Sequence, residues 1–197
     1  MSFRRSTIAV LAPLAALSLS ACGVNSVPTA EENAKAKWAN VQADYQRRAD
    51  LIPNLVETVK GFAKQEQGTL TAVVEARAKA TSVQLNAGDL SDPAKVAAFQ
   101  AAQGQLSGSL GRLLATVEAY PDLKSNANFL ALQSQLEGTE NRINISTKDY
   151  NEAVQSYNTT IRTFPDAIGA KIFYGAKPME TFKATAPNAD RAPTVKF

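Results

Sequence analysis

The feature that most constrains this chain is an apolar stripe of helical spacing in its N-terminal half. Its members recur at steps of three and four residues: Trp38, Val41, Tyr45, Ile52, Leu55, Val59 and Phe62. A stripe of this width faces the core of a helical protein. Arg48 fills the one gap in the series, and the period continues through Pro53. Because an internal proline kinks a helix without having to end it, we expect one long, kinked helix.

Three further segments carry the same periodicity, so the sequence predicts four helices. The first spans about residues 30–65, with Thr29 and Glu32 in the form of a capping box. The others cover about 69–85, 93–120 and 126–163, separated by a break near Gly68 and by turn signals at 86–89 and 120–122. Because one glycine is a weak breaker, the alternative is that the first helix continues through Gly68. Short links join antiparallel neighbours. We therefore expect an all-α fold, an antiparallel four-helix bundle over residues 30–164, with seams that resemble those of a coiled coil.

Residues 165–197 form an irregular C-terminal tail in this prediction, with one helical turn around 167–173. Ile168, Ile172, Phe173 and Tyr174 are too apolar for a free linker, so we expect part of the tail to pack on the bundle or on a partner. The last four residues, Thr194–Phe197, have the composition of an edge strand added to another protein. The bundle itself is expected to fold without residues 175–197.

Polar residues interrupt the apolar stripes of the first and last helices at one height of the expected bundle. The predicted polar layer consists of Arg48, Asp50, Asn54, Glu140 and Arg142. If the two helices align from about Ala30 to about Thr163, Asp50 lies beside Arg142, and we expect these two to pair. The alternative is that the side chains point separately to water, where a pair contributes about 0–1 kcal/mol.

The N-terminus has the pattern of a bacterial lipoprotein signal. Arg4 and Arg5 precede a short apolar region over residues 8–19, which is shorter than the roughly 20 residues of a membrane-spanning helix. Leu19-Ser20-Ala21-Cys22 resembles a lipobox. We therefore expect a signal peptide over 1–21, lipidation (palmitate among the acyl chains) at Cys22, and a tether over 22–29. The alternative is an ordinary cleavage site with an unmodified thiol.

The cysteine content, the net charge and the residue after Cys22 indicate where in the cell the protein resides and what it binds. Cys22 is the one cysteine, so no disulfide framework is predicted. Removing residues 1–21 takes away Arg4 and Arg5 and lowers the formal charge from +3 to +1, which gives a nucleic-acid partner no support. Because Gly23 rather than Asp follows the cysteine, we expect an outer-membrane lipoprotein facing the periplasm. Its partners are then the membrane, through the lipid, and an unknown envelope protein.

The sequence offers little for catalysis. It contains no histidine, which removes Ser-His and Cys-His pairs and imidazole metal sites. Glu137 and Glu140 lie three residues apart, but no second carboxylate pair accompanies them in a seam, so neither a metal nor another cofactor is expected. We expect a non-catalytic binding or scaffolding module. The alternative is an envelope enzyme that uses carboxylates and arginine in a bundle cleft.

Several ordered motifs resemble one protein family. They are Gln46-Arg47-Arg48-Ala49-Asp50-Leu51-Ile52-Pro53-Asn54-Leu55-Val56, Glu118-Ala119-Tyr120-Pro121-Asp122-Leu123-Lys124, Leu136-Glu137-Gly138-Thr139-Glu140-Asn141-Arg142-Ile143, Tyr150-Asn151-Glu152-Ala153-Val154 and Ala192-Pro193-Thr194-Val195-Lys196-Phe197. On these motifs the chain resembles the LemA family over roughly residues 30–197. The resemblance implies a four-helix bundle exposed at a membrane, without an established biochemical activity. The chain departs from the family by carrying a lipobox where its members usually have an N-terminal membrane helix.

Overall fold

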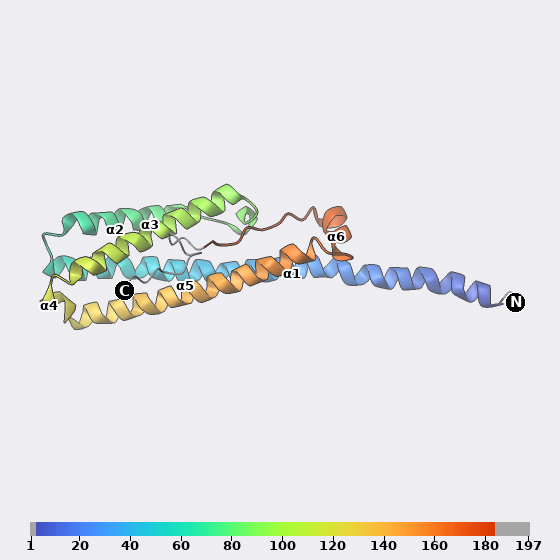
Figure 1. Cartoon of the computed structure of the whole chain (residues 1–197), viewed down its shortest axis with the longest axis horizontal. Helices are drawn as coiled ribbons and strands as arrows, with labels where there is room; N and C mark the ends of the chain where they lie inside the picture. The colour runs from blue at the N-terminus through green and yellow to red at the C-terminus, as the bar shows by residue number, and fades with distance from the viewer. Residues whose placement is uncertain (1–2, 184–197) are drawn as a thin grey trace, which may run out of the picture.

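The structure is a computed structural model that describes residues 3–183, with side chains from residue 25 onward (Figure 1). Its helices are α1 (Phe3–Phe62), α2 (Gln67–Ser82), α3 (Pro93–Val117), α4 (Pro121–Lys124), α5 (Ala127–Thr160) and α6 (Asp166–Gly169). A 3₁₀ turn, η1 (Ala87–Asp89), and a π-helical turn, η2 (Ala170–Tyr174), complete the elements. Residues 3–183 contain no strand, which confirms the all-α prediction. The predicted edge strand at 194–197 lies outside the described residues.

The N-terminal boundary of the first helix differs from the prediction. Thr29 does not cap a helix, because its hydroxyl donates to the carbonyl of Asn25 one turn earlier in α1, at 2.7 Å. Val27 is fully buried, as is Ala34. The apolar stripe thus starts before Ala30, and burial of its early members favours helix where we expected a tether. α1 also continues through Pro53 without a break.

The other boundaries follow local signals. Asp92 caps α3 by accepting from the backbone N–H groups of Ala94 and Lys95, and Pro93 occupies the first turn. The Asn126 side chain caps α5 in the same way. Such caps satisfy donors that have no partner inside the helix. The chain turns at residues 63–66 rather than at Gly68, and α4 is a short helix that the periodicity did not predict.

The helices form three packed pairs around two apolar cores. α1 packs along α5 and along α2, and α2 packs along α3, whereas the side between α3 and α5 is not closed by direct helix packing. One core lies towards α4 and includes Ile52, Leu55, Leu106, Leu113 and Leu136. The other lies towards α6 and includes Val27, Trp38, Phe99, Tyr150 and Phe182. Among the described residues, none of the helices contains a stretch apolar and long enough to cross a bilayer.

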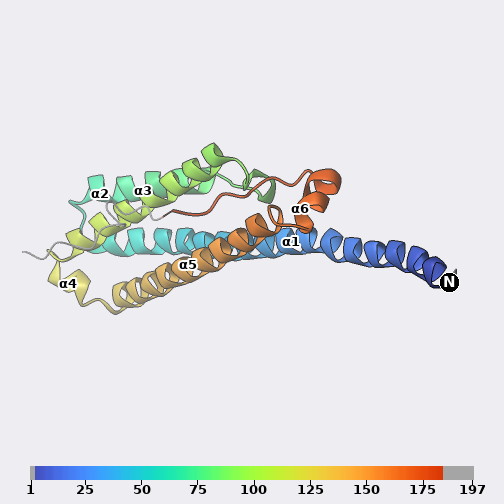
Figure 2. The same ribbon diagram turned by 45° about the vertical axis from the view of Figure 1, so that its right-hand side comes forward.

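A segment that we call the strap, residues 176–183, enters between α3 and α5 (Figure 2). Its Met179 and Phe182 are buried in the second core. The backbone N–H of Glu180 donates to the carbonyl of Leu90 at 2.8 Å. The strap is therefore part of the fold, and its two buried side chains confirm that part of the tail packs on the bundle. That the bundle folds without residues 175–197 stays a prediction. The burial of the strap itself was not predicted, because an extended segment has no apolar period to reveal it.

An aromatic cluster joins the strap to three helices. The Trp38 ring stacks on Phe182 at 5.6 Å between ring centroids and lies edge-on to Phe99 at 5.4 Å. The indole N–H donates to the carbonyl of Leu85 at 3.1 Å. Trp38 faces Tyr150 of α5 at 5.6 Å. The register of α1 on α5 therefore differs from the one that alignment of the helix ends predicted.

Truncation of Phe182 tests the structural role of the strap. Phe182→Ala should lower the free energy of unfolding by about 3–5 kcal/mol, because the ring is buried among aromatic side chains. Phe164→Ala is the matched control, since the Phe164 side chain is 80% exposed, and should change stability by no more than about 0.5 kcal/mol. Urea denaturation followed by circular dichroism measures both. Equal losses would show that the strap is not core.

Candidate functional site

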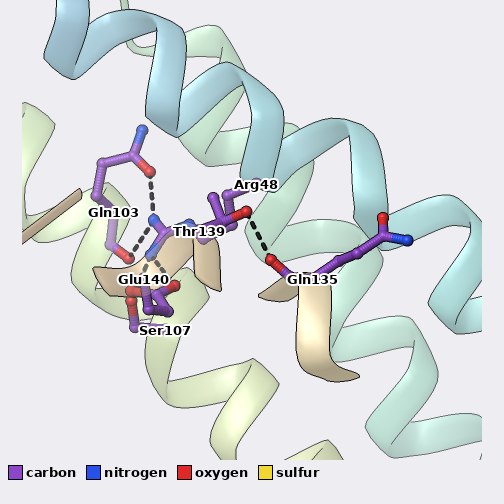
Figure 3. Close-up of polar contacts among 6 residues, drawn as sticks. All are labelled: Arg48, Gln103, Ser107, Gln135, Thr139 and Glu140. Carbon is purple, nitrogen blue, oxygen red and sulfur yellow. Dashed lines mark hydrogen bonds and ion pairs between the residues drawn. The ribbon is translucent and has the colours of Figure 1, made fainter. Parts of the chain in front are cut away.

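Arg48 lies at the centre of a buried polar cluster between α1, α3 and α5 (Figure 3). Its side chain is 1% exposed. Nη1 donates to Glu140 Oε1 at 2.9 Å and to Ser107 Oγ at 2.8 Å. Nη2 donates to the side chain and the backbone carbonyl of Gln103, at 2.6 and 3.3 Å. A guanidinium can be buried at little cost only when it forms several hydrogen bonds of this kind.

The surroundings of Arg48 complete the cluster. Gln103 uses its amide nitrogen to donate to the carbonyl of Ala80 at 3.2 Å, which connects α3 to α2. The guanidinium carbon lies 5.0 Å from the centroid of the Tyr45 ring, within cation–π range. Burial raises the pKa of Tyr45, so this ring stays neutral beside the charge. The cluster lies between the two apolar cores and separates them.

The structure brings together two members of the predicted polar layer and leaves three apart. Arg48 and Glu140 are paired, whereas Asp50, Asn54 and Arg142 are exposed. The predicted pair of Asp50 with Arg142 is wrong. Asp50 accepts from Gln46 at 2.7 Å, and Arg142 Nε donates to the carbonyl of Gly138 at 3.4 Å, each within its own helix.

The error has a geometric cause. Facing residues of α1 and α5 lie five or more positions from where the alignment of helix ends placed them, as the contacts of Arg48 with Glu140 and of Trp38 with Tyr150 show. Five residues are about one and a half helical turns, so different levels of the two helices meet. Asp50 and Arg142 also lie two residues from Arg48 and Glu140, or about 200° around their helices, and so point away from the seam. The predicted polar layer did not include Ser107 or Gln103, although both accept hydrogen bonds from Arg48. Gln103 interrupts the apolar series of α3, and this interruption could have indicated that α3 contributes to the layer.

A groove of about 1060 Å³ runs along α5 beside this cluster. Its walls come from α1, α3, α5 and the strap, and they include Tyr45, Arg48, Gly104, Ser107, Asn144 and Phe182. The groove occupies the side of the fold that helix packing leaves open between α3 and α5. Residues 181–183 of the strap form part of its wall, and Arg48 and Glu140 line it as well.

Two asparagines of α5 hold the strap by its main chain. The Asn158 amide donates to the carbonyl of Met179 at 2.8 Å and accepts from the N–H of Met179 at 2.9 Å. Asn151 does the same with Phe182, at 2.9 and 2.8 Å. Each amide thus replaces the peptide group of a neighbouring strand. The sequence reasoning missed these residues, although their seven-residue spacing places them on one face of a helix.

Tyrosines of α5 add two further bonds to the strap. Tyr150 and Tyr157 donate their hydroxyls to the carbonyls of Glu180 and Lys177, at 3.0 and 3.1 Å. Burial raises the pKa of both phenols, so both remain donors at neutral pH. This face of α5 therefore recognises an extended main chain rather than particular side chains.

Among residues 25–183, whose side chains the structure describes, no group of three or more His, Cys, Asp or Glu residues is placed to hold a metal ion. Arg48 is committed to structural hydrogen bonds, and Glu140 to Arg48. What the site does in the structure is bind an extended polypeptide.

A pair of double-mutant cycles tests the corrected polar layer. The Arg48→Met and Glu140→Gln cycle should give a coupling free energy of about 1–3 kcal/mol, because Arg48 is buried while Glu140 is 42% exposed. The Asp50→Ala and Arg142→Ala cycle is the control and should be additive within about 0.5 kcal/mol. Urea unfolding gives both. Coupling in the second cycle and none in the first would restore the original pairing.

Comparison with known proteins identifies the family. The chain is 28% identical to magnetosome protein MamQ 2 of Paramagnetospirillum magneticum over 177 residues, covering 80% of this chain and 64% of that protein. It is 27% identical to magnetosome protein MamQ of Magnetospirillum gryphiswaldense over 176 residues, with the same coverage.

Protein LemA of Metamycoplasma hominis is 25% identical over 124 residues, which cover 63% of this chain and 52% of that protein. The chain thus spans less than two thirds of the length of the curated relatives it matches. The names of these relatives describe no catalytic activity. The LemA family model matches residues 37–197, and the chain therefore belongs to the LemA family.

Proposed function

We propose that this protein is a membrane-anchored, non-catalytic binding or scaffolding module of the bacterial envelope. In this proposal its four long helices act as an antiparallel four-helix bundle, and the strap closes the fourth side. The observation that carries the proposal is a set of exposed apolar side chains on and around α6. α6 lies at the end of the fold where α1 leaves the other helices (Figures 1 and 2). We call this surface the apolar cap.

The apolar cap consists of exposed side chains between the end of α5 and the end of η2. Its members are Phe164, Ile168, Ile172, Phe173 and Tyr174. Exposed apolar residues gathered in so short a segment mark an interaction surface. Arg162, Lys171 and Lys177 are exposed around them, and basic residues of this kind are attracted to anionic lipid headgroups. Apolar side chains framed by basic ones suit the surface of a bilayer.

The position of the apolar cap relative to Cys22 also supports its contact with the membrane. Ser26 donates to Asp166 Oδ1 at 2.5 Å, which holds α6 against α1. Ser26 lies four residues after Cys22, or about 6 Å along a helix. A lipid on Cys22 would therefore bring the cap to the membrane surface. Two acyl chains hold a protein stably, whereas one holds only marginally.

The remaining assignments belong to the same proposal. Residues 1–21 act as the signal peptide, Cys22 carries the lipid, and the protein faces the periplasm from the outer membrane. The magnetosome proteins among its relatives are named for an organelle rather than for a reaction, which is consistent with a scaffolding role. The alternative is an enzyme that uses carboxylates and arginine in the groove. The geometry supports it less, because Glu140 and Arg48 are hydrogen-bonded to each other in the structural cluster.

Replacement of the cysteine tests the anchor. Cys22→Ala should abolish labelling by an alkyne analogue of palmitate and should release the protein from the total membrane fraction, because the lipid is its proposed anchor. Fractionation with immunoblotting and in-gel fluorescence measure both. Ser26→Ala serves as the control and should keep the label. Retention of the unlabelled variant in the membrane would contradict the assignment of Cys22.

A charge placed in the apolar cap tests its contact with lipid. In the unlipidated chain that begins at Gly23, Phe173→Asp should weaken binding to phosphatidylglycerol-containing vesicles by about tenfold or more, because a large apolar side chain would no longer enter the bilayer surface. Ile145→Asp is the matched control, since Ile145 and Phe173 are 63% and 67% exposed. Vesicle co-sedimentation gives the partition coefficients. Equal weakening by both variants would remove the cap as a membrane surface.

A further inference from the structure

The asparagine contacts of the strap follow a regular register. Asn151 and Asn158 are seven residues apart on α5, and they bind Phe182 and Met179, three residues apart on the strap. Seven helical residues rise about 10.5 Å, and three extended residues span about 10 Å. Seven residues are also nearly two full turns, so the side chains stay on one face. An asparagine at every seventh position thus meets every third residue of an extended chain.

Asn144 is the next position in this register. It lies seven residues before Asn151 and lines the same groove. Its side chain is exposed and forms no hydrogen bond within residues 3–183. The strap advances along α5 towards lower residue numbers, from Asn158 to Asn151. The residue three positions after Phe182 is Thr185.

The groove beyond Phe182 has room for a main chain. Gly104, Gly108 and Gly111 on α3 have open space where a side chain would be, with no atom within 4 Å, and Gly104 lines the groove. A main chain that runs along this wall can therefore approach α3 closely at Gly104.

We propose that the groove is a binding site for an extended main chain, with Asn144 as its third clamp and residues 184–197 of this same chain as its occupant. The Asn144 amide donates to the carbonyl of Thr185 and accepts from its N–H, as Asn151 does with Phe182. The described chain ends at Lys183, which itself lines the groove. Residues 184–197 therefore begin inside the groove, and binding of Thr185 to Asn144 requires no further loop to be closed.

The length and composition of the segment fit this site. Fourteen residues follow Lys183 and span up to about 46 Å when extended. The remaining length of α5, from Asn144 back to Ala127, is about 26 Å. The segment is therefore long enough to pass Asn144 and to follow α5 to its start. A proline at a clamped position would remove the N–H that the asparagine accepts from. The prolines are at 187 and 193, so Thr185, the residue that Asn144 would bind, keeps its N–H.

Hydrogen exchange of single amides in the full chain tests the proposal by NMR. The N–H of Thr185 should exchange at least tenfold more slowly than in a random coil, and Asn144→Ala should remove this protection. Asn144→Asp should keep part of it, because a carboxylate still accepts from the N–H. Asn141→Ala is the matched control, an exposed asparagine of α5 outside the groove, and should leave Thr185 protected. Protection of the Phe182 amide in every variant shows that the fold is intact.

Three results would overturn the proposal. Amide hydrogen exchange of Thr185 at the random-coil rate in the unaltered protein would show that residues 184–197 do not occupy the groove. Protection that survives Asn144→Ala would mean that Asn144 is not a clamp. Protection that increases with protein concentration would show that the occupant is the tail of a second copy, or another extended chain, instead of the same molecule.

Discussion

The burial of one charged side chain, Arg48, constrains the arrangement of the long helices. Moving a guanidinium out of water costs several kcal/mol unless its donors are bonded and its charge is paired. In this protein Glu140 of α5 supplies the charge, and Gln103 and Ser107 of α3 supply further acceptors. A shift of α5 along α1 by one turn would separate Arg48 from Glu140. The cluster therefore selects one register for α1, α3 and α5, and an apolar core lies on either side of it.

The strap is the second element on which the fold depends. Because α3 and α5 do not pack directly, the side between them needs another element. Phe182 fills part of this space against Trp38, and Asn151 and Asn158 satisfy the strap's backbone groups. An extended segment without a neighbouring strand would otherwise bury unpaired N–H and C=O groups. The side-chain amides satisfy these backbone groups whatever side chains the strap carries, whereas the packing of Phe182 against Trp38 is specific to this sequence.

The two ends of the fold have different properties. At the end near Ser26, apolar and basic side chains are exposed beside α1, as expected of a surface that meets lipid. Farther along α5, the groove beside Arg48 is suited to bind polypeptide. In the proposed function the first surface meets the membrane, whereas in the proposed binding site the second holds residues 184–197 of the same chain.

The sequence alone determined the helices, because apolar periodicity and caps such as Asp92 and Asn126 act locally. It also indicated a polar layer, because Arg48 stood in the middle of an apolar stripe. The partner of Arg48 was decided by tertiary structure, since the level at which α5 meets α1 depends on how the two helices pack along their whole length. Asp50 and Arg142 face water because each lies two residues from a member of this pair, on another side of its helix. Tertiary structure also decided the burial of the strap. An extended segment held by side chains of another helix leaves no period in its own sequence, so the information that places it resides in Asn151 and Asn158.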